Sequence, residues 1–152
     1  MPLIEHLSRL LAEAGAAKLV VSGRYPAYAG VQDQVPGLGP LGGLMSVADT
    51  LPNGDLLIVP VDMPRLAPAR LRQLMSACGP CLTFEGQVLP MRLRLDAVSR
   101  AALRRLATAP PPLRSLRALQ QALGVLQLPL LPEHVPEFDN CNTPLQWLAM
   151  RP

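Results

Sequence analysis

The stretch from Asp55 to Asp62 constrains the fold more than any other part of the chain. Every residue between these two aspartates is apolar, and Leu56, Leu57, Ile58 and Val59 follow one another without a break. A strand with one face in water would alternate apolar and polar side chains, whereas a strand covered on both faces reads as a continuous apolar run. The stretch therefore predicts a central strand of a sheet with helices on both faces, and it ends at a carboxylate.

The rest of the chain alternates helical and extended patterns around this strand. A long segment rich in glycine and proline, residues 23–43, is expected to be a surface loop. Alternating strands and helices predict a three-layer, doubly wound α/β fold with a mainly parallel sheet. The expected helices cover residues 2–14, 44–51, 68–77, 97–108, 113–123 and 144–149, and the other expected strands cover 18–22, 81–84, 87–89 and 125–130.

Length and composition narrow the class of protein. The chain has 152 residues, of which 49% are hydrophobic and 16% charged, so it is expected to fold as a single domain over residues 1–152. Its net charge of +3 comes from dispersed arginines, which suits a small anionic ligand better than nucleic acid. No apolar run is long enough for a membrane span, and three cysteines argue against a disulfide scaffold. We therefore expect a cytoplasmic protein with neither membrane nor nucleic acid as a partner.

Asp62 is the first candidate for a functional residue. In open parallel sheets, ligands gather at the carboxyl ends of the strands, and a carboxylate there can hold Mg²⁺. The alternative is that Asp62 only caps the turn that leaves the strand, or the helix that follows.

A glycine-rich segment, Gly37–Gly43, precedes an expected helix. Its backbone amides, together with the positive end of the helix dipole, could receive a phosphate or the polar edge of a nucleotide. The segment also matches the G-x-G-x-x-G pattern of dinucleotide-binding folds. Pro40 has no amide to offer a pyrophosphate, however, and the segment follows a long loop instead of a strand, so this second interpretation is disfavoured.

Cys78 and Cys81 have the spacing of a thioredoxin-type redox pair. In such proteins the first thiol is activated at the start of a helix. Here the expected helix precedes the pair and a strand follows it, so a turn that contains two unactivated thiols is favoured.

The histidines and several arginines carry weaker signals. His6 is expected on the polar side of the first helix and His134 in a proline-flanked loop, and neither has the spacing of a metal pair or a catalytic triad. Arg24, Arg65 and Arg92 could each meet a phosphate, but solvated surface arginines are common.

Three segments together resemble the molybdenum cofactor guanylyltransferase (MobA) family, whose fold is that of the sugar-nucleotide transferases. They are Gly39–Gly43, Pro60–Pro64 and Phe138–Pro144, in this order along the chain. The helix that opens with residues 2–7, PLIEHL, is also similar to the first helix of the family. The last segment, FDNCNTP, contains an N-cap for the helix that follows, by Asn142 or Thr143, but an N-cap does not explain Asn140.

The resemblance implies a reaction and a set of site residues. The reaction is the transfer of GMP from GTP to molybdopterin, with release of pyrophosphate and with Mg²⁺ as the required metal. Asp62 takes the position of the metal-binding, catalytic aspartate. By the same resemblance, the acceptor side comprises Asn140 and Asn142. The nucleotide site comprises Ser22, Asp33, Gly39, Pro40, Leu41 and Asp62. At the position of Ser22 the family usually has asparagine.

The chain departs from the family at its beginning. Members of the family open with a strand and a phosphate-binding loop of the pattern LAGGxxxRMGxxK, and this chain starts after that pattern. We therefore expect an incomplete sheet and weak or no turnover from these residues alone. The alternatives are a cytidylyltransferase for the same pterin, a non-catalytic partner in delivery of the cofactor to molybdoenzymes and, more remotely, a thiol oxidoreductase.

Overall fold

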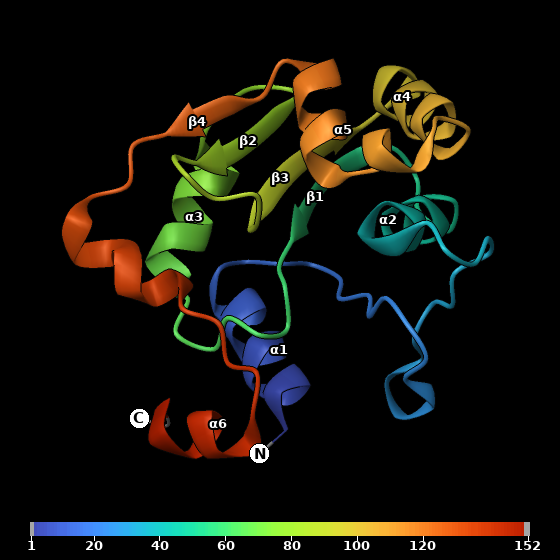
Figure 1. Ribbon diagram of the computed structural model, residues 1–152. Coiled ribbons are helices and arrows are strands. Elements are labelled where there is room, and N and C mark those ends of the chain that lie inside the picture. Colours follow the sequence, from blue (N-terminus) through green and yellow to red (C-terminus); the bar gives the residue numbers. More distant parts are fainter. Residues whose placement is uncertain (1, 151–152) are drawn as a thin grey trace.

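A mixed four-stranded sheet organises the computed structural model, which describes residues 2–150 (Figure 1). The strand order is β1-β3-β2-β4. Strand β3 runs antiparallel to both β1 and β2, whereas β4 pairs with β2 in parallel. Three strands therefore share one direction, as the predicted fold requires, and β3 is the exception. The strands are β1 (Gly54–Ile58), β2 (Cys81–Phe84), β3 (Met91–Leu95) and β4 (Leu126–Leu128).

Helices cover both faces of this sheet, which confirms the predicted three-layer architecture (Figure 1). One hydrophobic core joins the sheet to α2, α4 and α5, and the other joins it to α3 and the segment around Phe138. The helices are α1 (Leu3–Glu13), α2 (Gly39–Ala48), α3 (Pro68–Ser76), α4 (Ala97–Ala107), α5 (Leu116–Leu123) and α6 (Pro144–Met150), with short 3₁₀ turns at Pro26–Tyr28, Pro111–Leu113 and Pro132–Phe138. None of the helices within residues 2–150 is long and apolar enough to cross a bilayer.

The apolar run that begins at Asp55 is covered on both faces but is not central. Leu56 and Ile58 pack against the first core, and Leu57 and Val59 against the second. Within the described residues, however, β1 pairs only with β3 and is an edge strand. The central position predicted for it is wrong, because continuous apolarity reports the covering of the two faces and not the number of neighbouring strands. The strand also ends at Ile58, four residues before Asp62.

Strand β3 replaces the strand predicted at residues 87–89. Its sequence MRLRL alternates, so that Met91, Leu93 and Leu95 are buried in the first core while Arg92 and Arg94 point to the opposite face. This period of two is the signature of a strand. The prediction placed the strand too early because it expected a tight hairpin at Glu85–Gly86.

The segment 18–22, predicted as a buried parallel strand, does not join the sheet. Ser22 forms one isolated parallel bridge with Val31, and Leu19 is 43% exposed. Because the segment pairs with the loop that follows it, its apolar side chains enter neither core.

Two helix boundaries also differ from the prediction. Helix α2 starts at Gly39, within the expected loop, because the fixed φ of Pro40 suits the first turn of a helix. Helix α5 starts at Leu116 because the side chain of Ser115 caps it. The other predicted helices agree with the structure to within two residues, and Asp96 and Ser99 form a capping box on α4.

Candidate functional site

Asp62 lies in the loop that connects β1 to α3, residues 59–67. Its backbone carbonyl accepts a short hydrogen bond of 2.6 Å from the amide of Cys141. Its side chain forms no hydrogen bond or ion pair within residues 2–150, although the residue is half-buried. The structure therefore fixes the backbone of Asp62 and leaves its carboxylate available for a ligand.

The hydrogen bond to Cys141 places Asn140 and Asn142 beside Asp62. Cys141 is only 4% exposed, whereas both asparagines are exposed. Gln146 Oε1 accepts from the amides of Asn142 at 2.7 Å and Thr143 at 3.2 Å, and Thr143 Oγ1 accepts from the amide of Gln146 at 3.1 Å. This reciprocal cap confirms Thr143 as the N-cap of α6. Next to it lies a hollow of about 370 Å³, lined by Pro2, Leu3, Cys141, Asn142, Thr143, Pro144 and Trp147.

Ser22 and Asp33 lie together against α2. A Cβ atom built on Gly43 would come within 2.8 Å of Ser22 Oγ and 3.5 Å of Asp33 Oδ1. Gly43 thus lets Ser22 approach the helix more closely than any larger residue would, and Asp33 lies at ordinary contact distance from the same position. The amide of the next residue, Gln34, donates to Ser46 Oγ at 2.9 Å and holds this loop on α2.

The first turn of α2 presents backbone groups rather than side chains. Gly39 has a φ of 61° and is exposed, and Pro40 is exposed but has no amide hydrogen. Leu41 is fully buried in the first core, so its side chain cannot contact a nucleotide. The amides of a first helical turn have no acceptor within the helix, which makes this turn suited to an anion.

The predicted residues thus form two groups. Asp62, Asn140 and Asn142 belong to one, and Ser22, Asp33 and the first turn of α2 to the other. Within residues 2–150, no hydrogen bond or ion pair joins the two groups directly.

Asp62 could supply one carboxylate to a magnesium ion. Residues 2–150 contain no cluster of three or more histidine, cysteine, aspartate or glutamate side chains that could hold a metal. Mg²⁺ is commonly held by one or two carboxylates together with the phosphates of the substrate and water. The oxygen chemistry of Asp62 fits an ion that arrives with a nucleotide, and it does not fit a metal held by protein groups alone.

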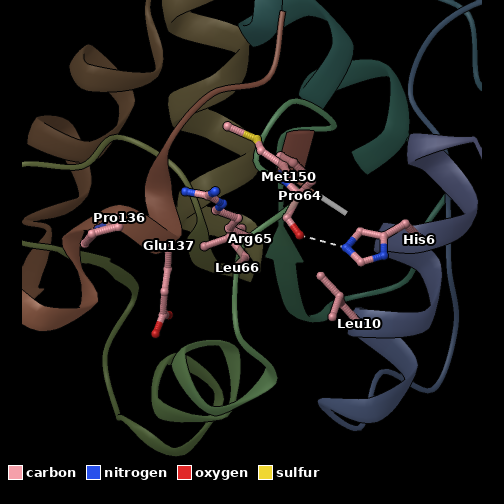
Figure 2. A pocket seen from close by; sticks show the side chains of 8 residues that line it. All are labelled: His6, Leu10, Pro64, Arg65, Leu66, Pro136, Glu137 and Met150. Carbon is pink, nitrogen blue, oxygen red and sulfur yellow. Dashed lines mark hydrogen bonds between the residues drawn. The ribbon is translucent and has the colours of Figure 1, made fainter. Parts of the chain in front are cut away.

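His6 contacts this region, which the sequence reasoning missed. Its Nε2 lies 2.7 Å from the carbonyl oxygen of Pro64, and its ring centroid lies 5.1 Å from that of Trp147. Figure 2 shows the imidazole reaching Pro64 across a hollow of about 390 Å³ that Leu10 also lines. The prediction that His6 lies on the polar side of its helix is therefore wrong. The available signal was its spacing of three from Leu3 and four from Leu10, which places it beside the apolar stripe.

The three candidate arginines differ in their exposure and in the groups that they contact. Arg92 donates to the carbonyl oxygens of Leu74 and Ala77 at the end of α3 and pairs with Asp55 at 2.9 Å, so it is used within the fold. Arg65 approaches Asp139 at 3.8 Å and remains exposed. Arg24 is exposed as well.

The other histidine is paired with acidic groups. His134 Nδ1 lies 3.0 Å from Glu137 Oε1, and its Nε2 lies 3.6 Å from Glu133 Oε1. His134 thus belongs to a local cluster with these two glutamates.

The cysteine pair occupies the turn between α3 and β2, as predicted. Cys78 is exposed and Cys81 is buried, and both are free thiols. Burial raises the pKa of the Cys81 thiol to about 11. In a thioredoxin-type pair the first thiol is activated at the start of a helix. Cys78 instead follows the end of α3 at Ser76, so this turn lacks that activation.

The three-layer fold and the carboxylate beyond a strand end are those of a Rossmann-like nucleotidyltransferase. Residues 1–125 match the MobA-like NTP transferase domain, and the chain belongs to this family. It is 49% identical over 148 residues to a molybdenum cofactor guanylyltransferase of Xanthomonas euvesicatoria pv. vesicatoria (strain 85-10), covering 96% of this chain and 78% of the relative. Among solved structures, the Aquifex aeolicus VF5 protein Aq1419 aligns with a TM-score of 0.65 at 14% identity, covering 92% of this chain and 82% of the other. At that identity the likeness concerns the fold alone.

Proposed function

We propose that this nucleotidyltransferase moves GMP from GTP to molybdopterin in the biosynthesis of the molybdenum cofactor. A phosphate oxygen of the pterin attacks the α-phosphorus of GTP, the bond between the α- and β-phosphates breaks, and pyrophosphate leaves. The 49% identity to a guanylyltransferase supports this choice of reaction. The observation that carries it is the hydrogen bond from Cys141 to Asp62, which joins the strand-end carboxylate to Asn140 and Asn142.

In this proposal each group of residues has one role. Asp62 would hold Mg²⁺, and the ion would supply positive charge to balance the charge that develops on the α-phosphate. Asn140 and Asn142 orient the acceptor on the side of Asp62 that Cys141 fixes. Ser22, Asp33 and the first turn of α2, residues Gly39, Pro40 and Leu41, bind the nucleotide. Leu41 supports this turn from within the first core, while Gly39 and Pro40 are exposed.

Two features support a cytoplasmic location for this protein. All three cysteines are free, which suits a reducing compartment. GTP is abundant in the cytoplasm, and we propose that the protein acts there and hands its product to molybdoenzymes or to proteins that deliver the cofactor.

A labelling experiment tests the reaction. The 152-residue chain is incubated at high protein concentration with molybdopterin, Mg²⁺ and GTP that carries ³²P at the α-position. We expect label in a dinucleotide form of the pterin together with released pyrophosphate, and neither product when Mg²⁺ is chelated. CTP labelled in the same way is the matched control.

The outcomes separate the candidate functions. Product from CTP but not from GTP would identify a cytidylyltransferase. If neither nucleotide gives product or raises the melting temperature, and a molybdoenzyme chaperone co-purifies, the protein is a non-catalytic partner. Insulin reduction by the free thiols would point to an oxidoreductase.

A further inference from the structure

We propose that His6 is a positioning residue, which holds the loop that carries Asp62 through the carbonyl group of Pro64. The inference about the catalytic consequence rests on the proposed function, whereas the inference about the loop rests on the contacts alone. It concerns residues 59–67, hereafter the Asp62 loop.

The contact is a long-range hydrogen bond with a defined direction. His6 Nε2 and the Pro64 oxygen are 2.7 Å apart although the residues lie 58 positions apart in the chain. A carbonyl oxygen can only accept, so the proton must be on Nε2. The bond therefore requires a donor at this particular position of the ring.

The Asp62 loop needs such a tie because it has no regular structure of its own. The Cys141 amide holds the carbonyl of Asp62 at 2.6 Å on one side, and His6 holds the carbonyl of Pro64 two residues later. Cys141 and His6 lie near opposite ends of the chain. Their hydrogen bonds fix the backbone at Asp62 and at Pro64, and the backbone between these points orients the Asp62 carboxylate.

The His6 contact lies where the loop passes from a hollow into the second core, in which Leu66 is buried. Pro64, Arg65 and Leu66 border the hollow of about 390 Å³ that separates them from Leu10 (Figure 2). On the side of an open hollow the loop has fewer protein atoms to pack against. The imidazole of His6 reaches past this hollow and supplies a fixed contact to the loop.

The histidine ring is itself held in place. It lies against Trp147 with a centroid separation of 5.1 Å and an interplanar angle of 56°. Trp147 belongs to α6, the helix that begins directly after Asn142 and Thr143. His6 thus connects the Asp62 loop to the helix that follows the acceptor-side asparagines.

Three variants separate the hydrogen bond from the bulk of the ring. His6→Phe keeps an aromatic ring against Trp147 but removes the donor. His6→Gln places an amide N–H close to the position of Nε2. The other histidine in the sequence, His134, gives the matched control His134→Phe, which lies outside the Asp62 loop and its ties.

The first measurement is hydrogen exchange of the backbone amides of residues 59–67 without any ligand. We expect exchange in His6→Phe to be roughly five to ten times faster than in the wild type, the effect of losing one hydrogen bond. His6→Gln should recover most of the protection, and His134→Phe should leave it unchanged. Equal exchange in His6→Phe and the wild type, or no recovery in His6→Gln, overturns the inference.

The second measurement is the Mg²⁺ concentration that gives half-maximal binding of a non-hydrolysable GTP analogue. His6→Phe should raise this concentration roughly five- to tenfold, while binding of the analogue without Mg²⁺ stays unchanged. A general loss of folding would weaken both. If the wild type binds no nucleotide, the proposed function fails, and the exchange measurement still decides whether His6 holds the loop.

Discussion

Asp62 and Asp33 are the two carboxylates of the candidate site, and the chain fixes them in different ways. The Asp62 loop is tied by Cys141 and His6, which come from the two ends of the chain, and Leu66 within it is buried. Asp33 is exposed, and its loop is held by one bridge between Ser22 and Val31 and by the bond from Gln34 to Ser46. The loop of Asp62 is therefore held by hydrogen bonds from residues far away in the sequence, and the loop of Asp33 by contacts with residues closer in the sequence.

From this difference we infer that Asp62 serves the reaction and Asp33 serves the binding of the nucleotide. Charge that develops in a transition state is stabilised best by groups that need not move during the reaction. A group that recognises a nucleotide can instead close on its ligand, because segments of low local stability rearrange easily. We expect changes at Asp62 to affect turnover and changes near Asp33 to affect affinity.

The largest expected effect is that of Asp62→Asn. The side chain keeps its shape but loses the charge that holds Mg²⁺, whereas the backbone carbonyl still accepts from Cys141. We expect product formation to fall by on the order of 10²–10³-fold with an unchanged melting temperature. Single-turnover assays and thermal unfolding measure the two. Activity within threefold of the wild type would remove Asp62 from the mechanism.

Asp33→Asn should affect the Michaelis constant instead. Loss of a charged acceptor for the nucleotide is expected to raise KM for GTP by roughly 10–100-fold, since hydrogen bonds to charged groups contribute about 1.5–3 kcal/mol. We expect kcat to change little. Steady-state kinetics with Ser22→Ala for comparison tests this, and a fall in kcat at constant KM would contradict the contrast between the two carboxylates.

Two neighbouring glycines of α2 separate stability from affinity. A Cβ on Gly42 would lie 2.6 Å from the Cβ of Leu38, so Gly42→Ala should lower the free energy of unfolding by about 1–3 kcal/mol. A Cβ on Gly43 would lie 2.8 Å from Ser22 Oγ and displace that side chain, which lies beside Asp33. Gly43→Ala should therefore weaken GTP binding several-fold, roughly the effect of one lost hydrogen bond, with little change in stability.

Urea denaturation and GTP titration of both variants distinguish these outcomes. If Gly43→Ala lowers stability as much as Gly42→Ala and leaves GTP binding intact, then Gly43 serves the fold and not the nucleotide site.

The smallest expected effect concerns Cys81, the first residue of β2. The pKa of Cys81 is about 11 in the folded protein, above the ordinary value of 9.0. Between these two pH values the unfolded chain loses the thiol proton and the folded chain keeps it, so stability falls as pH rises, by at most about 1.4 kcal/mol per pH unit. Urea denaturation between pH 9 and pH 11 should show this slope, and Cys81→Ala should reduce it. An equal slope in the variant would contradict the assignment to Cys81.

The layered fold could be predicted because local patterns determine it. Residues 56–59 are apolar on both sides of a strand, and each side meets one of the two cores. The position of that strand could not be predicted, because β3 lies between β1 and β2 and its arginine-containing pattern was overlooked. The prediction of a buried strand at residues 18–22 is wrong. The apolar residues of this segment are compatible with a strand, but the segment pairs only with the loop that follows it.

The candidate site was predicted in part. The polar run around Asn140 stands out in the sequence, and the structure brings it to Asp62. The closeness of Gly43 to Ser22 and Asp33, and the reach of His6 to Pro64, were not predicted. These contacts join residues 10–60 positions apart, and no local spacing rule covers such distances.

The sequence by itself determined which segments become helices, that helices cover both faces of the sheet, and which carboxylate follows the apolar strand, because apolar periodicity and capping act over a few residues. Only the tertiary structure decided the strand order, the burial of Leu41 and the two ties on the Asp62 loop. Those features depend on which distant segments pack together, since a hydrogen bond from either end of the chain to the Asp62 loop exists only after the layers have assembled.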